Sequence, residues 1–134
     1  MILGNVASFA DTNGQFKFYS YRDTTSNGLS SRYGSGNCGY TRIDVLKYVA
    51  FVFNGTTVTR YENGVANTPA SVTYQSGAKS QNWVIGGVNA TTETSGNGAY
   101  FNGKIFRIGI SAKAMTSEEI SQRYSFFAER FNIV

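Results

Sequence analysis

The chain has 134 residues, which suits one domain with a sizeable core and is too short for two ordinary domains. Charged residues make up only 15% and aromatic residues another 15%, a composition that disfavours a helical protein and favours a sheet protein. The formal net charge of +4 comes from basic residues that are spread along the chain without a run, so a nucleic-acid partner is not expected.

The first residues lack the basic leader and the apolar stretch of a signal peptide. No apolar run approaches the roughly 20 residues that a membrane-spanning helix needs. Cys38 is the only cysteine, so an intrachain disulfide is excluded. We therefore expect a soluble protein that does not insert into membranes and reaches a virion or an extracellular surface without a signal peptide.

Asn-Gly dipeptides punctuate the chain and predict tight hairpin turns, because both residues accept the positive φ of a type I′ turn. The apolar and alternating segments between them predict antiparallel strands, and residues 45–53, the most continuously apolar segment, suit a central strand. The Asn-Gly turns start at Asn13, Asn27, Asn54, Asn63, Asn97 and Asn102. The expected strands are residues 6–10, 15–22, 29–33, 45–53, 57–62, 82–87 and 103–110.

Near the C-terminus the apolar period changes to that of a helix. Thr116 is placed as an N-cap, Glu119 completes a capping box, and Met115 and Ile120 are spaced for a hydrophobic staple. The apolar stripe that follows must be buried against the sandwich or against another chain. The stripe consists of Ile120, Tyr124, Phe127 and Phe131.

Two segments resemble a known family. Residues 47–66 contain an apolar strand, a short turn and a second strand that ends in Tyr61-Glu62-Asn63-Gly64. Further on come Trp83-Val84-Ile85-Gly86-Gly87, Phe101-Asn102-Gly103-Lys104-Ile105, and Ala114-Met115-Thr116-Ser117-Glu118-Glu119-Ile120 with Tyr124. This order resembles the concanavalin A-like lectin and glucanase superfamily, especially its laminin G-like branch. The resemblance implies an all-β, antiparallel jelly-roll sandwich with one short C-terminal helix, spanning residues 1–134 as one domain.

The resemblance covers roughly the last two thirds of the chain. The N-terminal third departs from the family, whose opening strands are not recognisable in it. A sandwich without those strands exposes a sheet edge that can pair with another chain. We therefore expect a homo-oligomer, or contact with other structural proteins.

The acidic residues do not form the alternating row of carboxylates that the glucanases of this superfamily use, so an enzyme is not expected. No cofactor is expected either. Histidine is absent, which leaves calcium as the one reasonable metal, but no spacing matches a calcium loop. Its candidate ligands are Asp11, Asn13, Asp23 and Asp44.

Glycan binding by such sandwiches uses an exposed aromatic ring for stacking and polar side chains for the sugar hydroxyls. The polar, Gly-rich residues 30–42 fit this pattern best, and the candidates there are Tyr33, Asn37, Tyr40 and Arg42. Asn89 and Glu93 are a second choice in a later loop. The two tyrosines have an alternative role, that of covering the core at strand ends.

Three functions follow from these observations. The first is a non-catalytic, lectin-like adhesion domain of a virion or phage tail that recognises glycans. The second is a purely structural subunit that oligomerises within a virion or larger assembly. The third is a secreted carbohydrate-binding module of a larger protein.

Overall fold

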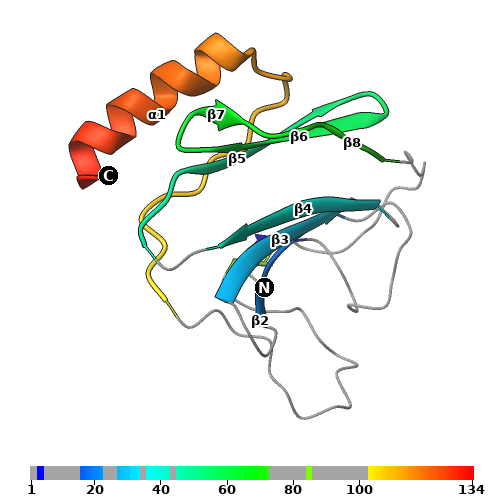
Figure 1. The fold of residues 1–134 in the computed structure, drawn as a ribbon, viewed down its shortest axis with the longest axis horizontal. Helices are drawn as coiled ribbons and strands as arrows, with labels where there is room; N and C mark the ends of the chain where they lie inside the picture. Colours follow the sequence, from blue (N-terminus) through cyan, green and yellow to red (C-terminus); the bar gives the residue numbers. More distant parts are fainter. Residues whose placement is uncertain are drawn as a thin grey trace.

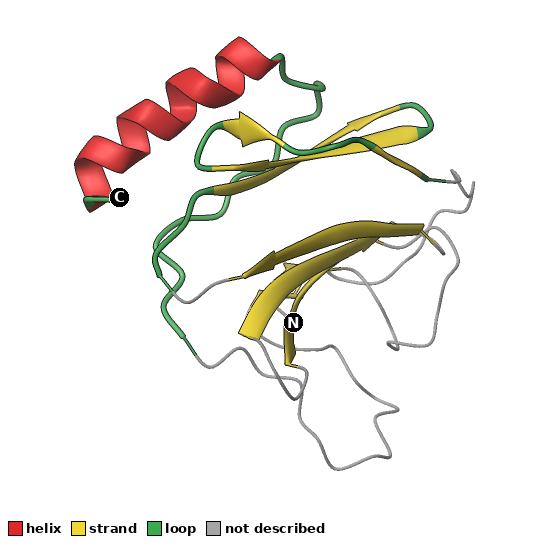
Figure 2. Cartoon of the chain, in the orientation of Figure 1, coloured by secondary structure: helices red, strands yellow, loops and turns green. Residues whose placement is uncertain are grey.

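The computed structural model describes residues 3–4, 16–22, 27–33, 36–42, 45–72, 84–85 and 103–134. These residues form two antiparallel sheets that face each other, with one C-terminal helix on the outer side of the smaller sheet (Figure 1). Figure 2 shows the same three layers by type of structure, from the helix through the smaller sheet to the larger one. The predicted fold class, antiparallel sheets with one short C-terminal helix, is confirmed.

The larger sheet has the strand order β4-β3-β2-β1-β9. Its strands are β1 (Leu3–Gly4), β2 (Phe16–Arg22), β3 (Asn27–Tyr33), β4 (Gly36–Arg42) and β9 (Val84–Ile85). The strands predicted at residues 15–22 and 29–33 are present, and the described part of residues 82–87, Val84–Ile85, is paired as a strand. The turn predicted at Asn27-Gly28 is wrong, because these residues pair with Arg22 and Tyr21 inside the ladder. The strand predicted at residues 6–10 lies outside the described residues.

The smaller sheet contains β5 (Val49–Asn54), β6 (Thr57–Glu62), β7 (Val65–Ala66) and β8 (Ala70–Ser71). Both β7 and β8 pair with β6, and so does β5. Among the described residues β5 therefore stands at the end of its sheet rather than at the centre where the sequence placed it. It also begins later than predicted, at Val49, with Val45 and Leu46 exposed before it.

The two tight turns of this sheet differ in type. Asn63 and Gly64 occupy the turn between β6 and β7 and have φ of 47° and 78°, as a type I′ turn requires. In the turn between β5 and β6 the two central residues are Gly55 and Thr56, and only Gly55 has a positive φ, 62°. That pattern is typical of a type II′ turn, so Asn54 closes β5 instead of standing in the turn.

The Asn63 turn also holds the start of β5. The backbone N–H of Asn63 donates to the Tyr48 carbonyl at 2.9 Å, and the Asn63 side-chain oxygen accepts from the Tyr48 N–H at 3.0 Å. These two bonds extend the β5–β6 ladder by one residue beyond the last strand pair, Val49 with Glu62. The asparagine side chain thereby satisfies a backbone donor that the turn would otherwise leave unpaired.

The two faces of the smaller sheet pack against different parts of the molecule. Val58 is 1% exposed and packs with Val72, Phe51, Phe53 and Ala70 to form the core. Residues alternate between faces along a strand, so Tyr61 belongs to the opposite face. Its hydroxyl lies 3.1 Å from the Ser117 hydroxyl at the start of the helix. The Val58 face therefore looks toward the larger sheet, whose strand β4 lies against β6 and β8.

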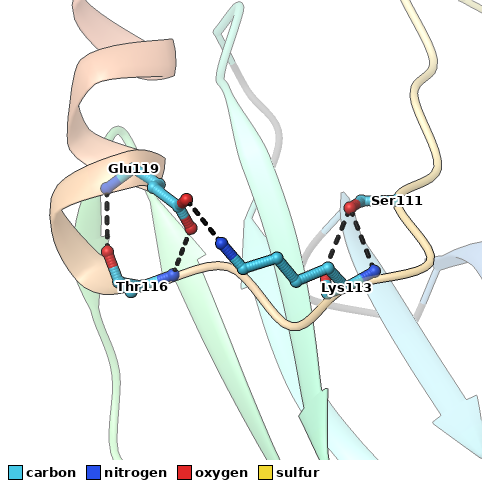
Figure 3. Close-up of polar contacts among 4 residues, drawn as sticks. All are labelled: Ser111, Lys113, Thr116 and Glu119. Atoms are coloured by element: carbon cyan, nitrogen blue, oxygen red, sulfur yellow. Dashed lines mark hydrogen bonds and ion pairs between the residues drawn. The ribbon is translucent and has the colours of Figure 1, made fainter.

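Helix α1 (Ser117–Phe131) begins as the sequence predicts. The Thr116 hydroxyl accepts from the Glu119 N–H at 3.2 Å, and the Glu119 carboxylate accepts from the Thr116 N–H at 2.8 Å (Figure 3). Lys113 adds a third contact, donating to the same carboxylate at 2.9 Å. The predicted capping box is confirmed, and Ile120 behind it is 2% exposed.

Residues 103–110, predicted as a strand, are not part of a sheet. The consecutive residues Phe106 and Arg107 both contact aromatic rings of α1. In a strand these two side chains would point to opposite faces, so engagement of both by one helix is incompatible with regular pairing.

Candidate functional site

The β3–β4 hairpin carries four of the six residues that the sequence proposed for glycan binding. Tyr33 closes β3, and Asn37, Tyr40 and Arg42 lie on β4, a strand that the sequence did not predict. Residues 30–42 are therefore mostly paired backbone rather than a free polar loop. Of the described strands, β4 stands at one end of the larger sheet.

A register shift between Ser30 and Arg32 decides how these positions align. Tyr40 pairs with Ser30, and Arg42 pairs with Gly28. Beyond the shift Asn37 pairs with Arg32. An extra residue in one strand is the mark of a β-bulge. As a result Asn37, Tyr40 and Arg42 all pair with even-numbered residues of β3. Tyr33 is an odd-numbered residue of β3, so it belongs to the other of the two alternating sets of positions.

The remaining sequence-based candidates are outside the described residues. This holds for Asn89 and Glu93, and for the calcium candidates Asp11, Asn13, Asp23 and Asp44. Within the described ranges, no three side chains of the metal-binding types come together.

A second feature is an aromatic cluster between α1 and the sandwich. Tyr48 lies 6.1 Å from Tyr124 and is stacked on Phe127 at 6.0 Å between ring centroids. The rings then continue from Phe127 to Phe131 at 6.1 Å, and from Phe131 to Phe106 at 5.5 Å. The predicted apolar stripe of the helix thus packs on its own chain, with Ile120 buried and the other rings in contact with Tyr48 and Phe106.

Two guanidinium groups lie against this aromatic cluster. Arg107 lies over the Phe127 ring at 4.8 Å, and Arg130 lies over the Phe131 ring at 5.8 Å. Cations in this position are attracted by the negative face of the ring. The outer rings are open to solvent, since Phe106 is 53% exposed and Phe126 is 58% exposed. An aromatic and cationic surface of this kind can contact another macromolecule.

A third feature is an ion group on the inward face of β6. Glu62 lies 3.2 Å from Arg60 and 3.8 Å from Lys47. All three side chains are largely buried, and the Nε and Nη1 atoms of Arg60 are buried without a hydrogen-bond partner. Removal of Glu62 would leave the two cations of this group partly buried without their counter-charge, which is costly.

Burial and hydrogen bonding shift the pKa of two acidic groups around α1. Burial raises the pKa of the Tyr48 phenol above its ordinary value, an effect that the nearby Arg123 guanidinium opposes. Hydrogen bonds from the Lys113 side chain and the Thr116 backbone lower the pKa of Glu119. Glu119 is therefore ionised at neutral pH, and it lies in the first turn of α1, where the helix dipole favours negative charge.

A family model described as the concanavalin A-like lectin/glucanases superfamily matches residues 4–121. The chain belongs to this superfamily. The match begins at residue 4, so it also covers the N-terminal third, which the motifs alone had left out. Comparison with curated proteins gives no match, and neither does comparison with solved structures.

In this member of the superfamily, the motif residues have physical roles that the structure makes visible. Gly64 approaches α1 so closely that an added Cβ would lie 2.9 Å from the Tyr124 ring. Tyr61 contacts Ser117, and Asn63 holds Tyr48. The segment 61–64 and the tyrosine of the helix, recognised separately in the sequence, are thus parts of one contact between sheet and helix.

Sequence reasoning did not single out Tyr48, Phe106 or Phe126 as functional residues. Phe126 carries a detectable signal, because it lies outside the stripe of Ile120, Tyr124, Phe127 and Phe131 and so must face away from the sandwich. Phe106 carries none, since its exposure depends on a segment that fails to pair. Among the described residues, no helix is long and apolar enough to cross a membrane.

Proposed function

We propose that this chain is a non-catalytic, lectin-like domain that binds glycans and serves as an adhesion component of a virion or phage tail. Membership of a superfamily that includes lectins supports a binding role. The low charged fraction, together with a surface rich in Gly, Ser, Thr and Asn, suits a protein of a particle exterior. The described carboxylates with defined contacts serve ion pairs and a helix cap.

We place the proposed glycan site on the β3–β4 hairpin, and the register shift is the observation that supports this choice. Because of that shift, Asn37, Tyr40 and Arg42 belong to one set of alternating positions. Their residue types are a stacking ring, an amide and a guanidinium, which together suit a sugar face and its hydroxyls. Since β4 lies against β6 and β8, only one of the two sets can face away from the smaller sheet.

The experiment is a glycan array probed with the wild-type chain and three alanine variants. Tyr40→Ala and Arg42→Ala are expected to lower binding at least about tenfold. Tyr33→Ala, a change in the other register set, is the matched control and is expected to bind like the wild type. Circular dichroism confirms that each variant is folded. Absence of glycan binding by the wild type overturns the proposal, and a loss confined to Tyr33→Ala moves the site to the other set.

A structural subunit that oligomerises is the second candidate. The observation in its favour is the exposed part of the aromatic cluster, where Phe106 and Phe126 are more than half open to solvent. Large exposed aromatic side chains in a group often mark a protein interface. A stable oligomer without any glycan signal would favour this candidate over the lectin-like one.

A further inference from the structure

One flank of α1 carries a regular pattern that the contact with the sandwich does not use. Glu119, Arg123, Phe126 and Arg130 are separated by four, three and four residues. Residues at these spacings form one stripe along a helix, the same spacing that makes a coiled-coil seam. Ile120 is buried, Tyr124 and Phe127 are partly buried, and all three lie on a different side of the helix, so the seam runs beside the contact with the sheet.

This seam is open to solvent along its length. Phe126 is 58% exposed, and the Glu119 side chain is 39% exposed. Arg123 and Arg130 are exposed as well. A phenylalanine at the centre of a charged, exposed helix flank contributes little to the packing of the described residues, where its ring contact is an edge contact with Phe127 of the same helix at 5.2 Å.

The charges of the seam are self-complementary in one arrangement. An antiparallel two-fold axis between Tyr124 and Ser125 places Glu119 opposite Arg130 of a second copy. The same axis places Arg123 opposite Phe126, because the two pairs share one midpoint in the sequence. A parallel arrangement would instead set each charge against its own copy.

We propose that α1 is a self-association surface, on which the α1 of a second copy docks antiparallel about this axis. Each contact occurs twice, as a two-fold interface requires. Two ion pairs join Glu119 to Arg130 of the other copy, and two cation–π contacts join Arg123 to its Phe126. Glu119 keeps its bonds to Thr116 and Lys113, since a carboxylate has about four lone-pair sites and those bonds use two.

The interface is independent of the proposed glycan site. Helix α1 covers the outer side of the smaller sheet, whereas the β3–β4 hairpin belongs to the larger sheet (Figure 1). If the chain binds glycans as a monomer, the proposed lectin-like function stands and only the proposed self-association is overturned.

The test measures the dimer dissociation constant by sedimentation equilibrium for the wild type and three single variants. F126R sets two cations against each other in the proposed register and is expected to raise the constant at least about tenfold. F126E removes the same ring but sets a carboxylate against Arg123, so association is retained. S121R makes the same charge change on the opposite flank and is expected to behave like the wild type. Both positions are exposed, so folding is expected to survive in all three variants.

Added salt is expected to weaken the wild-type dimer, because exposed ion pairs are screened. A wild type that stays monomeric into the high micromolar range overturns the proposal. An equal loss of affinity in F126R and F126E overturns the proposed register. In that case loss of the ring alone weakens the dimer, and the charge placed opposite Arg123 has no effect.

Discussion

Gly64 is the residue at which the turn between β6 and β7 touches α1. We expect Gly64→Ala to lower the free energy of unfolding by about 2–4 kcal/mol, from the left-handed backbone and from overpacking. The added Cβ meets Tyr124 at 2.9 Å, and the residue has a φ of 78°.

Gly55→Ala is the matched control for this prediction. Gly55 also has a positive φ, 62°, but no atom lies within 4 Å of its added Cβ. Only the backbone cost, about 1–2 kcal/mol, is therefore expected there. Denaturant unfolding of both variants measures the difference, and equal losses would show that the contact with Tyr124 is unimportant.

At the scale of elements, the helix start and one tight turn were predicted correctly, whereas features that depend on strand pairing were not. The capping box at Thr116 and the type I′ turn at Asn63 need only neighbouring residues, and both were predicted. Strand β4 was missed because Gly36, Asn37 and Gly39 have low strand propensity, and its pairing with β3 overrides that propensity.

The candidate site shows the same division. The residue types of Tyr33, Asn37, Tyr40 and Arg42 can be read from the sequence, whereas their alignment depends on one extra residue in β4. A one-residue change of register exchanges the two faces of a strand, and no periodicity within β4 reveals it. The exposure of Phe106 could not be predicted from the sequence either, because it depends on how this residue lies against α1.

The N-cap of α1 gives a prediction for the helix as a unit. Thr116→Ala removes the hydroxyl that accepts from the Glu119 N–H and is expected to cost about 1 kcal/mol of stability. Ser125→Ala is the control, since its hydroxyl is exposed and donates to the Ser121 carbonyl within the helix. A change within about 0.5 kcal/mol is expected for it. Thermal unfolding of the two variants separates these outcomes, and a Thr116→Ala protein as stable as the control would contradict the role of the cap.

For the whole molecule, the smaller sheet is the layer on which the other two depend. Its inward face holds the Val58 core and the ion group of Lys47, Arg60 and Glu62. Its outward face holds α1 through Tyr61 and the aromatic cluster. Both proposed binding surfaces, the β3–β4 hairpin and the outer flank of α1, are therefore positioned by strands β5 and β6 although neither lies on them.

That arrangement predicts one cooperative unfolding unit, in keeping with a single domain over residues 1–134. Ile120→Ala truncates a side chain of α1 that is 2% exposed and is expected to lower the free energy of unfolding by about 2–5 kcal/mol. The helix signal in circular dichroism and the fluorescence of Trp83, the only tryptophan, are expected to shift together, because a chain that unfolds as one unit has one transition. Ile110→Ala changes the same residue type at a position that is 69% exposed, so its transition is expected to stay near that of the wild type. A shift of the helix signal alone would mean that α1 unfolds separately from the sandwich.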